Sequence, residues 1–166
     1  MTKDLINGIA TFIILCLVQS LVLNHIHIFG FATPLLYIYM VVQFRRNYPK
    51  WGILLWCFLL GMVIDTFSNT PGVTSASLLV TGAIQPYFFN MFLQQDSAED
   101  IRPAVATLGF AKYLFYISVL IFIHCLLFFT LETFNFFNLL QWIKCIGGST
   151  LLTIILILTI ESVRNK

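Results

Sequence analysis

Residues 51–79 read WGILLWCFLLGMVIDTFSNTPGVTSASLL, and this stretch decides the fold class. It opens with an apolar run over 51–67, in which Asp65 carries the only formal charge. The turn-forming segment Ser68–Gly72 follows, and a second apolar run begins at Val73. A run of about 17 to 25 apolar residues has the length of a transmembrane helix. The stretch therefore predicts two membrane-spanning helices joined by a short polar turn.

The composition extends this prediction to the whole chain. Of its 166 residues, 59% are hydrophobic and 10% are charged, and the mean hydropathy is +0.92. Soluble domains contain about 45–50% apolar and about 25% charged residues, so a soluble fold of this size would expose a large apolar patch. An aromatic content of 16% argues against disorder. The apolar runs also lack the alternation of a membrane β-barrel. We expect an all-α, polytopic membrane protein.

Six apolar runs are long enough, or nearly so, to cross a bilayer, at 5–23, 28–44, 51–67, 73–93, 113–131 and 143–160. Six such helices use about 120 residues, so the remainder suffices only for short loops. We therefore expect one transmembrane domain over 1–166. The opening residues lack the features of a cleaved signal peptide, and we expect the first span to be retained.

The basic residues predict the orientation. Only Lys144 falls in or beside an odd-numbered loop, and the other eight lie at the termini or in the second and fourth loops: Lys3, Arg45, Arg46, Lys50, Arg102, Lys112, Arg164 and Lys166. Cytoplasmic loops of membrane proteins are enriched in Lys and Arg. Both termini are therefore predicted to be cytoplasmic. The net charge of +2 marks topology and does not indicate nucleic acid binding.

Asp65 makes the end of the third run the candidate functional region. It lies about 21 Å along a helix from Trp51, in the outer half of a hydrocarbon core about 30 Å thick or at its edge. A carboxylate at this depth is costly and points to function. Gly61 lies one turn earlier on the same face and allows close approach of a neighbouring backbone. Three interpretations stay open: Asp65 caps the following turn, it recognises a partner, or it takes part in proton or ion chemistry.

The fourth run carries a polar stripe. Ser77, Thr81 and Gln85 recur at intervals of four residues and should face another helix. Gly82 and Pro86 favour close packing and a kink. Hydroxyl side chains at the start of the run can cap it: Thr74, Ser75 and Ser77.

Several other polar residues are secondary candidates. His124 and Glu132 share a face of the fifth run, and His124 is predicted to be a neutral packing histidine or, alternatively, a partner of Asp65. Asn24–His27 is predicted to be an ordinary polar loop, because His-x-His without a nearby Cys or carboxylate is weak evidence for metal. The four cysteines have no metal-like spacing and are predicted to be packed thiols. No phosphate loop, nucleophile elbow or zinc motif is present, so we expect no enzyme and no cofactor.

The motif order resembles a known family. Gly61-Met62-Val63-Ile64-Asp65 ends the third run, and Pro71-Gly72-Val73-Thr74-Ser75-Ala76 leads into the fourth. The bacterial rod-shape-determining protein MreD family shares a third span ending in Gly-x-x-x-Asp and a short Gly- and Ala-containing loop before the fourth. The stretches 21–37 and 124–132 are also similar to the family. The resemblance marks five residues as the motif site: Gly61, Asp65, Pro71, Gly72 and Ala76.

This resemblance implies a non-catalytic membrane scaffold in the complex that guides side-wall peptidoglycan synthesis and maintains rod shape. The implied partners are a bitopic MreC-like protein, the MreB filament, the RodA glycosyltransferase and a class B penicillin-binding transpeptidase. On physical grounds, a partner helix would dock in a groove lined by small residues.

A second reading is transport. Members of this family resemble the six-helix substrate-binding subunits of energy-coupling-factor transporters, which would bind a small molecule near the outer face. Those subunits typically carry Ala-x-x-x-Ala in the first span. The nearest equivalents here are Gly8-x-x-x-Phe12 and Ala10-x-x-x-Ile14, so the pattern fails. The scaffold is therefore the expected function and the transporter subunit the alternative.

Overall fold

The computed structural model describes residues 2–23, 33–93, 101–133 and 139–164, with side chains from residue 8 onward. Over these ranges the chain is all-helical, which confirms the predicted class. The helices are α1 (Thr2–Leu21), α2 (Ile38–Val42), α3 (Lys50–Ser68), α4 (Val73–Phe92), α5 (Val105–Leu108), α6 (Phe110–Thr133) and α7 (Leu139–Arg164). The predicted loop Asn24–His27 and the acidic residues Asp96, Glu99 and Asp100 lie outside the described residues.

Three of the described helices, α3, α6 and α7, are long and apolar enough to cross a membrane. Each turns large apolar side chains outward, for example Leu55, Phe122 and Ile155. An apolar surface of this extent is unfavourable in water and favourable against lipid tails. These helices therefore fit a membrane protein. Helices α1 and α4 lie over two further apolar runs, and α4 carries the polar stripe.

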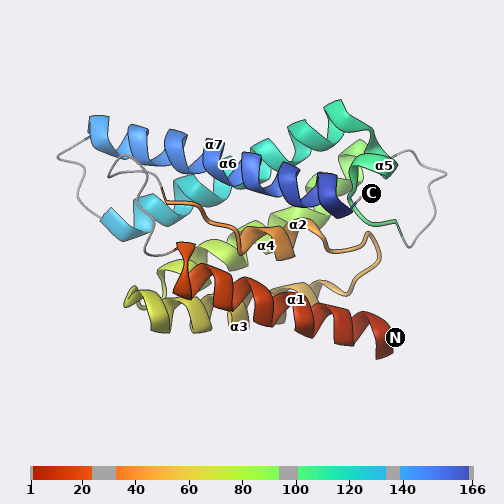
Figure 1. Cartoon of the computed structure of the whole chain (residues 1–166), viewed down its shortest axis with the longest axis horizontal. Helices are drawn as coiled ribbons and strands as arrows, with labels where there is room; N and C mark the ends of the chain where they lie inside the picture. Colours follow the sequence, from red (N-terminus) through yellow and green to blue (C-terminus); the bar gives the residue numbers. More distant parts are fainter. Residues whose placement is uncertain (1, 24–32, 94–100, 134–138, 165–166) are drawn as a thin grey trace.

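The helices are arranged in layers (Figure 1). Helix α1 packs on α3, α6 packs on α7, and α4 lies between the two pairs in contact with α3 and α6. The two termini lie at one end of the bundle, together with the starts of α3 and α6, whereas the turn between α3 and α4 lies at the other end (Figure 1). A common end for both termini is what the distribution of basic residues predicts.

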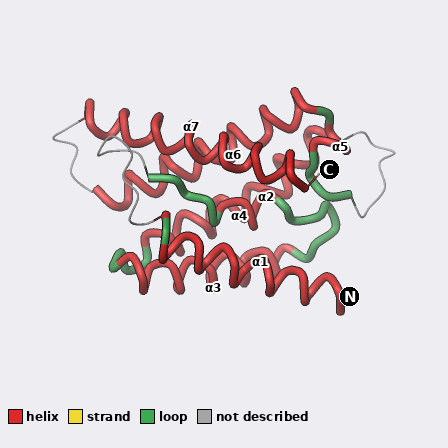
Figure 2. The backbone as a smooth tube through the Cα atoms, in the orientation of Figure 1, coloured by secondary structure: helices red, strands yellow, loops and turns green. Residues whose placement is uncertain are grey.

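The segment expected to form a second span, 28–44, has a different structure in its described part. Only α2 is helical there, and residues 33–37 form turns and irregular backbone (Figure 2). A helix of five residues is about 7.5 Å long, too short to cross a bilayer. The run Leu35–Val42 is entirely buried, and α2 contacts α1, α4 and α6. Its hydrophobicity therefore reflects burial within the protein, where irregular backbone is tolerated because other helices cover it.

Candidate functional site

Asp65 caps the N-terminus of the next helix. One carboxylate oxygen, Oδ1, accepts a hydrogen bond from the Thr74 N–H (2.8 Å) and one from the Thr70 hydroxyl (3.2 Å). The other, Oδ2, accepts from the Ser75 N–H (3.0 Å) and the Ser75 hydroxyl (2.6 Å). The first turn of a helix carries unsatisfied N–H donors and partial positive charge. Asp65 supplies from α3 the acceptor that a capping side chain of α4 would normally supply, and only 6% of the residue is exposed.

Gly61 permits this contact. A Cβ atom added at Gly61 would overlap the Ser75 Cα and lie 2.7 Å from the Ser75 backbone nitrogen. A second close approach occurs further along the same pair of helices, where a Cβ at Gly82 would lie 2.6 Å from the Cys57 sulfur. The predicted close packing at both glycines is therefore present. Helices α3 and α4 are held together by two glycine contacts and one carboxylate.

The turn between α3 and α4 uses two left-handed backbone positions. Asn69 has φ 56° and Gly72 has φ 83°, conformations for which Asn and Gly are favoured. The Asp65 carbonyl accepts hydrogen bonds from the Asn69 and Thr70 N–H groups, which ends α3. Pro71 is exposed at the tip, and the half-buried Ala76 donates its N–H to the Gly72 carbonyl. All five motif residues thus lie in one compact joint.

The polar stripe of α4 faces inward, as predicted. Ser77, Thr81 and Gln85 have no exposed surface. The Gln85 amide donates to the Tyr116 hydroxyl (3.0 Å) on α6 and to the Phe44 carbonyl (3.3 Å). The stripe therefore joins α4 to α6 and to the buried segment that contains α2.

His124 lies at the centre of this interface and is fully buried. Its Nδ1 is 3.3 Å from the Thr81 hydroxyl oxygen, and its Nε2 is 3.0 Å from the Tyr37 hydroxyl. Thr81 uses its own proton in a 2.7 Å hydrogen bond to the Ser77 carbonyl. With the ring proton on Nδ1, the imidazole donates to Thr81 and its Nε2 accepts from Tyr37, an assignment that gives both ring nitrogens a partner. This arrangement agrees with the predicted neutral packing histidine.

Asp65 and His124 are not hydrogen-bonded to each other. The partners of Asp65 are in the α3–α4 joint, whereas those of His124 are Tyr37 and Thr81. Similar depth in the bundle therefore does not make them a pair. Glu132 also differs from His124, because it is exposed near the end of α6. The predicted shared face continues only as far as Phe128, which stacks on the His124 ring at 6.4 Å between centroids.

Sequence reasoning missed the residues that hold the irregular segment. The Gln19 side chain of α1 donates to the Pro34 carbonyl (3.0 Å) and accepts from the Leu36 N–H (3.0 Å). From α7, the Ser149 hydroxyl accepts from the Thr33 N–H (3.1 Å), and Thr153 accepts from Leu35 N–H (3.1 Å). Side chains thus replace the hydrogen bonds that a helix would make with its own backbone.

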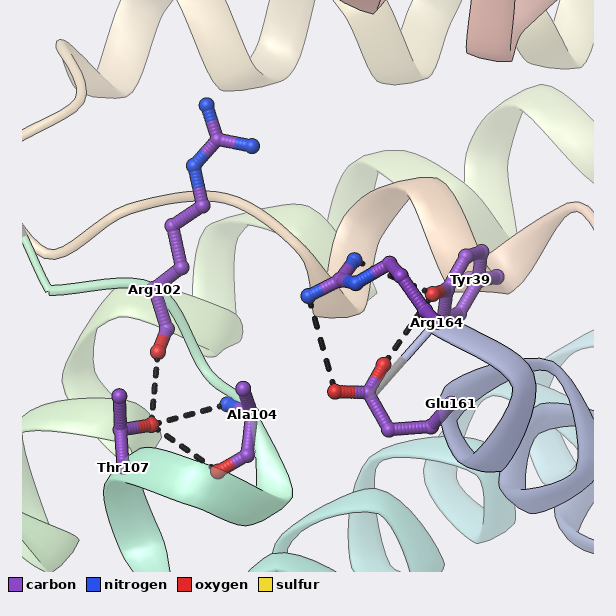
Figure 3. A network of polar contacts seen from close by, with 6 residues as sticks. All are labelled: Tyr39, Arg102, Ala104, Thr107, Glu161 and Arg164. Atoms are coloured by element: carbon purple, nitrogen blue, oxygen red, sulfur yellow. Dashed lines mark hydrogen bonds and ion pairs between the residues drawn. The ribbon is translucent and has the colours of Figure 1, made fainter. Parts of the chain in front are cut away.

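A buried carboxylate at the opposite end of the bundle was also missed. Glu161 is 1% exposed, although it lies just beyond the predicted sixth span. Its Oε2 accepts from the Tyr39 hydroxyl (3.2 Å), and its Oε1 lies 3.6 Å from an Arg164 nitrogen. Figure 3 shows Arg164 reaching over both groups, with its other nitrogen 3.2 Å from the Tyr39 oxygen. The cluster fastens the end of α7 to α2.

A second polar contact at this end closes the connection into α6. Figure 3 shows the Thr107 hydroxyl between the Arg102 and Ala104 carbonyls, and it also accepts from the Ala104 N–H.

The sequence contains a pattern that indicates the buried face of α7. Ser149, Thr153, Ile157 and Glu161 recur every four residues and are all buried. The same four-residue spacing that marks the polar stripe of α4 thus marks this face of α7.

The geometry describes a joint and a set of interhelical braces. Among the described residues, no three His, Cys, Asp or Glu side chains are placed to hold a metal ion. Cys16, Cys57 and Cys125 are buried free thiols and Cys145 is half-buried, as the packing interpretation predicted.

Comparison of the chain with protein-family models, with curated proteins and with solved structures found no match.

Proposed function

We propose that this protein is a non-catalytic membrane scaffold of the bacterial cell-elongation complex, which maintains rod shape and guides side-wall peptidoglycan synthesis. It crosses the inner membrane six times with both termini in the cytoplasm, and the second crossing is made by irregular backbone and the short helix α2 together, covered by the other helices. Its partner is a bitopic MreC-like protein, with MreB, RodA and a class B penicillin-binding transpeptidase in the same assembly.

One observation carries this proposal: the motif that resembles the MreD family forms a compact, hydrogen-bonded joint between α3 and α4. Every oxygen of the Asp65 carboxylate accepts hydrogen bonds from α4 or its turn, at 2.6 to 3.2 Å. At the same level, the absence of a side chain at Gly61 allows α3 and α4 to approach closely. A carboxylate whose two oxygens are both hydrogen-bonded within the protein stabilises the packing of α3 against α4. A fixed α3–α4 pair is what a protein needs when it acts by positioning partners.

The test is a crosslinking pull-down from native membranes, with the full-length protein tagged at its C-terminus. Recovery of an MreC-like bitopic protein together with wall-synthesis enzymes is the expected result. Recovery of an ATPase pair with a coupling subunit, and no wall-synthesis proteins, would contradict it and identify a transporter's binding subunit.

The role of the motif is tested separately with Asp65→Asn. If the joint positions the partner, the variant protein recovers less of the MreC-like partner and its cells lose rod shape. Unaltered partner recovery and cell shape would mean that Asp65 serves only the fold. Thr66→Val is the matched control, because the exposed Thr66 hydroxyl bonds only to the Met62 carbonyl of its own helix.

A further inference from the structure

Three buried polar atoms toward the end of the bundle that holds both termini have no hydrogen-bond partner among the described residues. They are Gln85 Oε1 on α4, the Tyr113 hydroxyl oxygen on α6 and Glu161 Oε1 on α7. None of these three residues is more than 1% exposed. Buried polar atoms are almost always paired, either with protein or with ordered water, so each of these atoms needs a partner.

The three atoms belong to one cluster that joins three helices. The Gln85 amide nitrogen donates to the Tyr116 hydroxyl (3.0 Å), and Tyr116 lies one turn after Tyr113 on α6. The Tyr113 hydroxyl interacts electrostatically with Tyr116 and with Glu161. Tyr113 is one turn from the start of α6 and Glu161 is one turn from the end of α7, and these two helices pack together.

The hydrogen bonds already present leave no donor for the two acceptor oxygens. The Phe44 carbonyl, which can only accept, fixes the direction of the Gln85 amide, because its nitrogen must face that carbonyl (3.3 Å). The Tyr39 hydroxyl donates its proton to the other Glu161 oxygen, Oε2. Figure 3 shows Arg164 beside Glu161, but its nitrogen lies 3.6 Å from Oε1, beyond hydrogen-bond distance.

The three atoms cannot satisfy one another. An amide oxygen and a carboxylate oxygen only accept, and the Tyr113 hydroxyl carries a single proton. At least one of the two acceptors therefore requires a donor from a bound molecule. Arg164 already balances the charge of Glu161, so a neutral donor suits the cluster better than a cation. Water is the smallest neutral molecule that donates twice, and a buried water commonly bonds to about three polar groups.

We propose that Gln85, Tyr113 and Glu161 form a site for internal water that joins α4, α6 and α7. The water donates to the Gln85 and Glu161 oxygens and accepts from the Tyr113 hydroxyl. It exchanges with the aqueous phase beside Arg164, whose side chain is 41% exposed. The proposal concerns the bundle itself, so it stands or falls independently of the scaffold function.

A crystal structure of the full-length protein grown from a lipidic mesophase, at a resolution that shows ordered solvent, tests the site. We expect solvent density about 2.5–3.2 Å from the Tyr113 hydroxyl oxygen and from Gln85 Oε1 or Glu161 Oε1. A map without this density would overturn the proposal, as would a direct hydrogen bond from Tyr113 to Glu161 Oε1. Density that disappears when sodium is replaced by choline would also overturn it, because the occupant would then be a cation.

Tyr113→Phe provides an independent test, because the sign of its effect depends on whether the hydroxyl is paired. Removal of a hydroxyl that bonds to internal water should lower the thermal unfolding temperature in bicelles by about 2–4 °C. Removal of an unpaired buried hydroxyl would leave that temperature unchanged or raise it, and either result would contradict the proposal. Tyr116→Phe is the matched control on the same helix, since its hydroxyl is paired with Gln85, and it should lower the temperature by a similar amount.

Discussion

At the scale of the residue, the most informative feature is a carboxylate that acts as a helix cap across a helix boundary. The α4 cap residue, Gly72, has no side chain and adopts a left-handed conformation. The donors of the first α4 turn are satisfied instead by Asp65 on α3. Removal of such an acceptor leaves buried N–H groups without a partner, which costs more than the hydrogen bonds themselves contribute.

We predict that Asp65→Asn lowers the free energy of unfolding by about 1–3 kcal/mol, because the amide keeps one acceptor oxygen and turns an NH₂ group toward an N–H donor. Equilibrium unfolding in lipid bicelles would measure the change. Thr66→Val should stay within about 0.5 kcal/mol of the unsubstituted protein, as for an ordinary surface substitution. A stability of Asp65→Asn equal to that of this control would show that the cap contributes nothing.

At the scale of the element, two devices position the helices. Glycines allow α3 and α4 to approach at Gly61 and Gly82. Polar side chains from α1 and α7 form hydrogen bonds with the irregular backbone of residues 33–36. Both devices are interhelical, so neither is available to an isolated segment.

Gly61→Ala should destabilise the protein by about 1–3 kcal/mol, the usual range for overpacking a tight contact. The added methyl would meet the Ser75 backbone, which has no side-chain freedom with which to move away. Gly147→Ala is the matched control on α7, since nothing lies within 4 Å of a Cβ there. It should be neutral or slightly stabilising. Equal thermal unfolding temperatures for the two variants would contradict the close contact.

Gln19→Leu should be the most damaging of the changes around residues 33–36. The substitution leaves the Pro34 carbonyl without its donor and the Leu36 N–H without its acceptor, at a cost of about 1–3 kcal/mol for each buried group. Thr153→Val leaves one backbone group of this segment, the Leu35 N–H, without its acceptor, and should cost about half as much, because the Ser149 carbonyl that the Thr153 hydroxyl also contacts lies within helix α7. The two variants are compared by unfolding in the same bicelles. If Thr153→Val proved equal to or worse than Gln19→Leu, this account of the segment would be wrong.

At the scale of the whole molecule, the charge distribution and the layered fold agree. The starts of α1, α3 and α6 and the end of α7 gather at the end that holds both termini (Figure 1), and these helix ends include Lys3, Lys50, Lys112 and Arg164. Helix α3 then runs from the basic end to the Asp65 joint. A helix of this length rises about 28 Å, close to the thickness of the hydrocarbon core.

Cysteine labelling tests this orientation. In a Cys145→Ser background, whose other three thiols are buried, Asn47→Cys and Pro71→Cys each add one exposed thiol at opposite ends of α3. We expect a membrane-impermeant maleimide to label position 71 in spheroplasts and position 47 only in inside-out vesicles. Labelling of both positions from the same side would exclude α3 as a membrane-spanning helix.

The sequence alone determined the all-α class, the helices α1, α3, α4, α6 and α7 to within a few residues, and the turn at 68–72. The four-residue spacing also predicted that Gly61 and Asp65 lie on one helix face and that the polar stripe of α4 faces other helices. These properties depend on apolar length, helical periodicity and turn-forming residues, which are local in the chain.

Only the tertiary structure decided what those residues meet. Hydrophobicity cannot distinguish burial in protein from burial in lipid, so the sequence predicts a full-length span over 28–44, whereas its described part, 33–44, is helical only in α2. Its backbone is irregular because Gln19 and α7 supply its hydrogen bonds. The partners of His124 and Glu161 are likewise Tyr37 and Tyr39, 87 and 122 residues away along the chain. Such contacts are set by the packing of whole helices, which no local pattern encodes.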